Sequence, residues 1–266
     1  MNTILSFIKR HSFVAFVVLS YLLSWWSAPF TNGQIIPYGP AVAAVIVLAI
    51  TSGRSGLGDL WRKVTNWRVA WYWYLIGPGM VASYVAGAYL LNLALGASVT
   101  TPPQLPSIGI LLELLLLGGM WEELGWSGYA LPTLQQRFAR RSNGVLVATL
   151  VTGVIRSIWH LPLFIYGHIH WFDALIFSFA FQIMISWLFN RSGGSVLIVM
   201  VFHFASNVIG GGIMHPVFTG ASQTSYYALM VTLAWTIAFA ILWKTSLKLG
   251  QDETKTISAI VDRQVV

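Results

Sequence analysis

Eight long apolar segments constrain the fold of this chain more than any other feature. Most approach the length of about 20 residues that an α-helix needs to cross the hydrocarbon core of a bilayer. Only 9% of the residues are charged, whereas soluble domains carry about 25%. The sequence therefore predicts an all-α membrane protein, a bundle of about eight transmembrane helices. The segments cover roughly residues 12–30, 35–51, 70–97, 107–131, 144–166, 171–190, 194–213 and 225–244.

The basic residues indicate how this bundle would be oriented. Of the 15 Lys and Arg residues, all except Arg156 lie at the two ends of the chain or in the loops after the second, fourth and sixth segments. Because short cytoplasmic loops collect Lys and Arg, both termini are predicted to lie in the cytoplasm. The net charge of +7 then reflects topology, and we expect no nucleic-acid partner.

The chain reads as one integral-membrane domain over residues 1–250, followed by a polar tail. The tail, residues 251–266, is predicted to be flexible. Basic and aromatic residues alternate over residues 60–68, which fits either a short helix lying in the membrane interface or an ordinary basic loop. The chain has no cysteine, which excludes disulfides, thiolate metal ligands and a cysteine nucleophile.

Ionisable residues inside the apolar segments are the first candidates for function, because charge at bilayer depth is costly. Glu122 and Glu123 are adjacent in the fourth segment, and Arg156 lies in the fifth. Neighbouring helical residues point about 100° apart. One glutamate can therefore face a cavity, while the other needs a separate partner. Glu113, about 2.5 turns earlier, is expected on a different face.

Two histidines and an asparagine complete this set. His203 and Asn207 are four residues apart, so they share a helix face and can both donate hydrogen bonds to a developing oxyanion. A carboxylate with two imidazoles can activate water. Glu122, His160 and His203 could instead hold zinc or another divalent metal, although the helical H-E-x-x-H signature is absent. Each residue taken alone also fits a polar clamp between packed helices.

Three short motifs resemble, in order and spacing, those of the CPBP intramembrane protease family. They are Trp121–Pro132 (WEELGWSGYALP), Trp159–Phe164 (WHLPLF) and His203-x-x-x-Asn207. The family contains the CAAX prenyl endopeptidases and bacterial relatives linked to bacteriocin processing or self-immunity. The motif core spans about residues 118–210. The resemblance places the protein in a membrane, by expectation the bacterial cytoplasmic membrane.

The resemblance implies an intramembrane endopeptidase and gives each motif residue a role. Glu122 would activate the hydrolytic water and His160 would hold that water or a metal. His203 and Asn207 would stabilise the oxyanion, and Glu123 would support the site. The family has been described both as metal-dependent and as a metal-free glutamate type, and both mechanisms remain open here. Substrates would be membrane-associated peptides or lipidated proteins, either prenylated or bacteriocin-like.

The chain departs from the family pattern at two positions, and both departures concern the position of one arginine. The first motif usually has Arg where this chain has Ser127, and the second usually has an aromatic residue where it has Arg156. We hypothesise that the guanidinium has moved from the fourth segment to the fifth and still pairs with Glu123 or Glu122, since a lone buried Arg would be hard to sustain. The alternative is an inactive family member that serves as an immunity or scaffold protein. A small transporter with a Glu/His proton relay fits the motifs less well.

Overall fold

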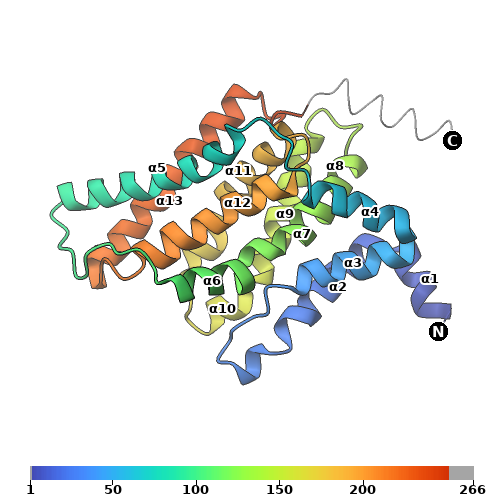
Figure 1. Ribbon diagram of the computed structural model, residues 1–266, viewed down its shortest axis with the longest axis horizontal. Coiled ribbons are helices and arrows are strands. Elements are labelled where there is room, and N and C mark those ends of the chain that lie inside the picture. The colour runs from blue at the N-terminus through green and yellow to red at the C-terminus, as the bar shows by residue number, and fades with distance from the viewer. Residues whose placement is uncertain (1, 252–266) are drawn as a thin grey trace.

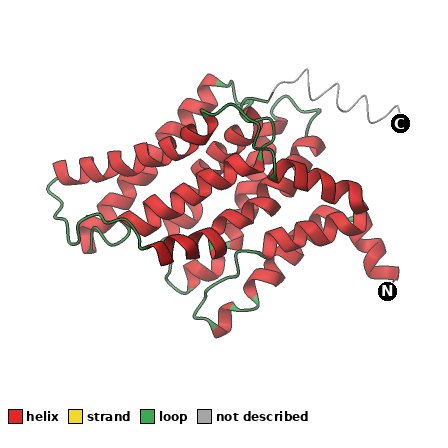
Figure 2. Ribbon diagram, viewed as in Figure 1, coloured by secondary structure: helices red, strands yellow, loops and turns green. Residues whose placement is uncertain are grey.

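The computed structural model describes residues 2–251, and within this range the fold is helical without a β-strand (Figures 1 and 2). The predicted flexible tail is residues 251–266, and all of it except Gln251 lies outside the described part. Four of the described helices are long and apolar enough to cross a membrane: Ser12–Phe30, Trp73–Ala94, Val196–Met214 and Gly220–Lys244. Three shorter apolar helices accompany them: Gly39–Thr51, Gly144–Trp159 and Leu175–Arg191. The predicted helical membrane bundle is thus confirmed.

The first half of the chain forms an N-terminal helical pair, an amphipathic helix and one long span. The bounds are α1 (Asn2–Arg10), α2 (Ser12–Trp25), the short 3-10 helix η1 (Ala28–Phe30), α3 (Gly39–Thr51), α4 (Gly53–Val64) and α5 (Trp73–Ala94). Pro40 opens α3, where a missing N–H costs nothing. Within the basic and aromatic stretch, a helix is confirmed only as far as Val64, because α4 ends there.

The second half of the chain holds the site and the remaining spans. The fourth apolar segment contains α6 (Ile108–Leu117), the 3-10 turn η2 (Gly119–Glu122), α7 (Glu123–Gly125), the π-helical turn η3 (Trp126–Ala130) and α8 (Leu131–Arg137). After it come α9 (Gly144–Trp159), α10 (Leu161–Ile165), the π-helical η4 (Phe172–Phe177), α11 (Ser178–Arg191), α12 (Val196–Ser206), the π-helical η5 (Asn207–Met214) and α13 (Gly220–Lys244).

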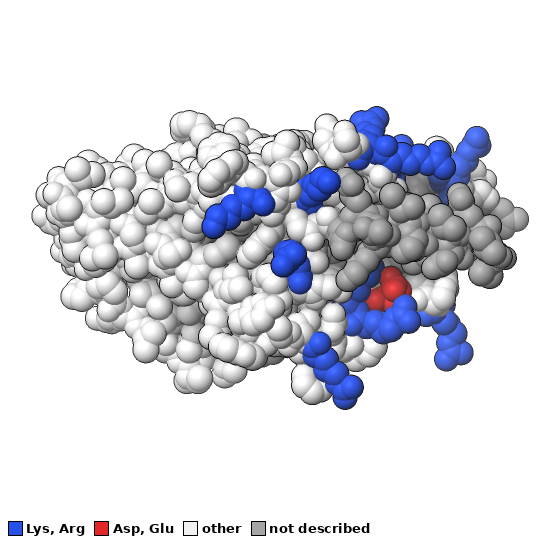
Figure 3. All heavy atoms as spheres, turned by 90° about the horizontal axis from the view of Figure 1, so that it is seen from above, with Lys and Arg blue, Asp and Glu red and all other residues white. Residues whose placement is uncertain are grey.

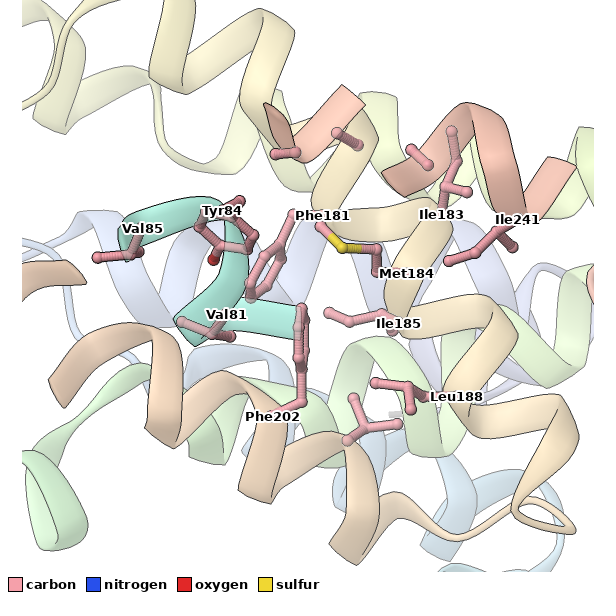
Figure 4. Packing of buried hydrophobic residues seen from close by; sticks show 14 of the residues in the cluster. Val81, Tyr84, Val85, Phe181, Ile183, Met184, Ile185, Leu188, Phe202 and Ile241 are labelled. Atoms are coloured by element: carbon pink, nitrogen blue, oxygen red, sulfur yellow. The ribbon is translucent and has the colours of Figure 1, made fainter. Parts of the chain in front are cut away.

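Two packed groups of helices enclose the broken fourth segment. In one group α2 packs on α3, and in the other α5, α11, α12 and α13 pack on one another. Helix α7 contacts α3 on one side and α12 on the other, and α9 contacts α11. The larger core includes Val81, Phe181, Met184 and Phe202, which Figure 4 shows pointing into the same interior. Residues of α7 and α9 are thereby held between apolar walls.

The fourth segment is not the continuous helix that its hydropathy suggests. Helix α6 ends at Leu117 and Gly118 has extended backbone. A Cβ on Gly118 would lie 2.1 Å from the carbonyl oxygen of Leu114, so only glycine fits this turn. The indole of Trp121 donates to the Leu115 carbonyl at 2.9 Å, and the Tyr38 hydroxyl donates to that of Leu116. These donors satisfy carbonyls that the break frees, as backbone at bilayer depth requires.

Lys and Arg side chains lie over the middle and one end of the face shown in Figure 3, and the other end of that face is free of them. Asp59 of α4 lies in this region and pairs with Arg62 at 2.8 Å and with Lys63 at 2.9 Å. These ion pairs lower the pKa of Asp59, although partial burial opposes the shift. The alternating basic loops thus converge on one end of the bundle. That this end faces the cytoplasm stays a prediction.

Candidate active site

The break in the fourth segment places two adjacent carboxylates inside the bundle. Glu122 is the last residue of η2 and Glu123 the first of α7. Their exposed fractions are 5% and 0%. As expected for neighbours on a helix, they point to different partners. Glu123 is held by hydrogen bonds and an ion pair, whereas Glu122 faces the backbone at Gly119.

Three side chains hold Glu123. Arg156 of α9 forms an ion pair with its Oε1, and the Ser127 hydroxyl donates to its Oε2. The Nδ1 atom of His203 lies 2.8 Å from Oε1. The ion pair that the sequence predicts is therefore present, with Glu123 as the closer partner, since Nη2 of Arg156 lies 3.7 Å from Oε2 of Glu122. Ser127 also binds Glu123 from the position where the family pattern has Arg.

Glu122 and His203 converge on the space beside Gly119. A Cβ built on Gly119 would lie 2.7 Å from Oε1 of Glu122 and 2.8 Å from Nε2 of His203. An ionised carboxylate only accepts hydrogen bonds, so His203 donates from Nδ1 to Glu123 and directs Nε2 towards this space. Oε2 of Glu122 is buried and has no hydrogen-bond partner among residues 2–251. A buried carboxylate with an unused oxygen is costly unless it serves a polar ligand.

His160 caps the end of α9, just before Pro162. Its Nδ1 donates to the Arg156 carbonyl at 2.8 Å, which leaves Nε2 as an acceptor. The Trp159 carbonyl, at the end of α9, accepts a hydrogen bond from the Trp25 indole at 2.9 Å. Helix α2 thus holds the end of α9 that carries His160.

Asn207 begins the π-helical turn η5, one turn after His203 on the continuation of α12. None of the described groups hydrogen-bonds to its side-chain amide, which is therefore available to another acceptor. Glu113, in contrast, is exposed on α6. The structure thus separates Glu113 from the buried glutamates, as the sequence predicts.

Whether Glu122, His160 and His203 hold a metal ion stays a prediction. Within residues 2–251 no three His, Cys, Asp or Glu side chains gather closely enough to hold one ion. Glu122 and His203 direct atoms to the same space, but His160 is not grouped with them at ligand distance. Three protein ligands are the usual minimum for catalytic zinc. The chemistry proposed below therefore uses protein groups alone.

Sequence reasoning missed several residues that shape this site. Gly119 provides the space that Glu122 and His203 share, and Gln182 of α11 hydrogen-bonds to Arg156 at 3.1 Å. The signal for Gly119 is the Gly118-Gly119 pair inside an apolar segment, which marks a break or a close backbone approach. Gln182 carries a weaker signal, as a polar residue within an apolar span.

Gly119→Ala tests the shared space directly. The added methyl group would overlap both Oε1 of Glu122 and Nε2 of His203, so we expect kcat to fall by about tenfold or more if water is activated there. Gly79→Ala is the matched control, because a Cβ on Gly79 would contact nothing within 4 Å. Peptide cleavage by the two purified variants checks this. Equal activity of both would show that the space beside Gly119 is not where the reaction occurs.

Comparison with known proteins agrees with the three motifs. Residues 104–209 match the family model described as type II CAAX prenyl endopeptidase Rce1-like. The chain is also similar to the CAAX prenyl protease 2 of Methanococcus maripaludis, with 32% identity over 108 residues. That alignment covers 36% of this chain and 38% of the archaeal protein, so the chain spans less than half of that relative's length. Over residues 104–209, this chain is therefore similar to the CAAX prenyl endopeptidases of the Rce1-like family.

Proposed function

We propose that this integral membrane protein is an endopeptidase that hydrolyses a peptide bond with water activated by Glu122. The observation that carries the proposal is the convergence of Oε1 of Glu122 and Nε2 of His203 on the space beside Gly119, within apolar helices. A water there would meet a carboxylate base and an imidazole acceptor. The match of residues 104–209 to the Rce1-like family model supports the same reaction class.

The reaction divides into attack and collapse. In the attack, Glu122 takes a proton from water while the water oxygen bonds to the carbonyl carbon, and the carbonyl π electrons move onto oxygen. In the collapse, this pair re-forms the C=O bond, the C–N bond breaks, and the proton held by Glu122 passes to the leaving nitrogen. A positioned general base of this kind contributes about 10²–10⁴-fold to the rate.

The oxyanion formed in the attack needs hydrogen-bond donors. The Asn207 amide has free N–H groups, and donors aimed at developing charge act strongly in a dry site. His203 can donate from Nε2 only as an imidazolium, because its Nδ1 proton already serves Glu123. Nε2 of His160 is an acceptor in the neutral ring, which suits our proposal that it helps to orient the water.

Substrates of this site would be membrane-associated. The name of the archaeal relative, CAAX prenyl protease 2, points to prenylated proteins, and lipid-anchored or bacteriocin-like peptides share the required access from the bilayer. The second candidate, an inactive immunity or scaffold protein, is favoured by Ser127 in place of the family Arg. Arg156 argues for activity, because it returns a guanidinium to Glu123 from another helix.

Cleavage of a peptide panel by the purified chain in lipid nanodiscs tests this proposal. The panel would contain prenylated and unmodified peptides, each with and without a metal chelator. We expect the membrane-associated peptides to be cleaved and chelation to leave the rate unchanged. Folded protein that cleaves none of them would favour the scaffold role. Loss of activity on chelation, with recovery on added zinc, would contradict the metal-free steps.

A further inference from the structure

Helix α11 lies outside the three motifs, yet two of its residues contact the groups that hold Glu123. Phe181 and Gln182 are buried on the side of α11 that packs against α9 and α12. Phe181 contacts Arg156 and His203, and Gln182 contacts Arg156. A fourth helix therefore takes part in the site.

Gln182 holds the end of the guanidinium that Glu123 does not. Its Oε1 accepts from Nη1 of Arg156 at 3.1 Å, and its Nε2 donates to the Ser186 hydroxyl at 3.3 Å. The exposed fractions of Arg156 and Gln182 are 2% and 1%, so water cannot readily replace this acceptor. The bond to Ser186, one turn along α11, fixes which end of the amide faces Arg156.

Phe181 supports the same two residues through its ring. The guanidinium carbon of Arg156 lies 5.6 Å from the ring centroid, within the range of a cation–π contact. The ring centroid of His203 lies 5.3 Å away, with the planes near perpendicular. Figure 4 shows Phe181 beside Tyr84 and Phe202 in the large core, which anchors the ring.

Arg156 lies close enough to Glu122 that a shift of its guanidinium would weaken Glu122 as a base. Nη2 of Arg156 bonds to Glu123, but it is only 3.7 Å from Oε2 of Glu122. A small rotation of the guanidinium would bring it onto Glu122, and a carboxylate in a close ion pair is a weaker base. The acceptor on Nη1 opposes this rotation. Guanidinium groups have fixed fork geometry, so restraining one nitrogen restrains the other.

We propose that Gln182 is a positioning residue that keeps Arg156 on Glu123 and off Glu122. The inference rests on the proposed function, because it concerns the basicity of Glu122 during hydrolysis. It also follows from the hypothesised move of the guanidinium, since an Arg at position 127 would approach Glu123 from the fourth segment and would not need α11. Activity is therefore expected to depend on Gln182 only when Arg156 supplies the guanidinium that pairs with Glu123.

A comparison of two backgrounds tests this proposal. In the unaltered chain, Gln182→Leu should lower kcat about tenfold with KM unchanged, because a hydrogen bond to a charged group is lost. In the double variant Ser127→Arg with Arg156→Met, the same substitution should change kcat less than about twofold. An equal loss of kcat in both backgrounds, or a loss confined to KM, would overturn the proposal.

A second variant keeps the test independent of how well Arg156→Met folds. Gln182→Glu retains an acceptor for Arg156, so it should still hold the guanidinium away from Glu122 and keep kcat well above that of Gln182→Leu. A kcat as low as that of Gln182→Leu would overturn the positioning role. Met184→Leu, a buried core change on the same helix, should have the same small effect in both backgrounds.

Thermal unfolding separates this proposal from the proposed function. If the unaltered chain cleaves no peptide, the endopeptidase assignment fails, but the contact of Gln182 with Arg156 still predicts coupled stability. Gln182→Leu should then lower the midpoint in the unaltered chain and leave it unchanged in Arg156→Met. Equal lowering in both would show that Gln182 does not act through Arg156.

Discussion

Glu122→Gln is expected to lower kcat for peptide cleavage by about 10²–10⁴-fold while the protein stays folded. The amide keeps the size and one acceptor oxygen of the side chain but cannot take a proton from water. The effect should appear in kcat, because the carboxylate acts on the attacking water and not on the bound peptide. Steady-state cleavage by the purified variant in nanodiscs measures it, with the thermal midpoint as the test of folding.

The chain offers a matched control for this substitution. Glu113→Gln makes the same chemical change nine residues earlier, where Glu113 is exposed on α6. We expect its kcat to remain within about twofold of the unaltered value, as for most surface substitutions. If Glu122→Gln and Glu113→Gln had the same activity, Glu122 could not be the base.

Arg156→Met is expected to reduce both stability and activity. The side chain is 2% exposed and its partner Glu123 is fully buried, so removing the guanidinium leaves an uncompensated carboxylate inside the bundle. Breaking a buried ion pair in this way costs about 3–5 kcal/mol. Thermal unfolding in detergent and peptide cleavage together measure the loss. A low yield of folded protein would be the extreme form of the same effect.

Adding Ser127→Arg to Arg156→Met should restore part of both properties. Ser127 already donates to Oε2 of Glu123, so a longer side chain at this position starts beside the carboxylate that has lost its partner. Recovery of thermal midpoint and kcat would show that the guanidinium can be supplied from either helix. The hypothesis of a moved charge would be wrong if Arg156→Met folded and cleaved normally by itself.

Much of the site could be predicted because a charged residue inside an apolar segment is costly, and such residues therefore have a partner or a function. Glu122, Glu123 and Arg156 are conspicuous in apolar segments, and a buried Arg requires an anionic partner. The predicted pair of Arg156 with Glu123 is present. Glu113 is exposed and apart from the buried glutamates, as predicted, but the break at Gly118 lies between them, so the 3.6-residue period is not the reason.

The break in the fourth segment could not be predicted from hydropathy. Apolar composition across residues 107–131 reads as one continuous span, whereas the structure turns at Gly118 and continues through 3-10 and π-helical turns. That turn depends on Tyr38, far away in sequence, which binds the carbonyl of Leu116. Periodicity contains no information about such distant partners. Gln182 could not be predicted for the same reason, because its proposed role depends on a hydrogen bond with Arg156, 26 positions earlier.

The central claim is that Glu122 activates the water that cleaves the peptide bond, and isotope labelling tests it most directly. The unaltered chain and Glu122→Gln would each be incubated with a membrane-associated peptide in H₂¹⁸O, and the new carboxyl terminus would be analysed by mass spectrometry. We predict that the unaltered chain forms product carrying ¹⁸O at that terminus and that Glu122→Gln forms almost none in the same time. Labelled product at equal rates from both proteins would contradict the account.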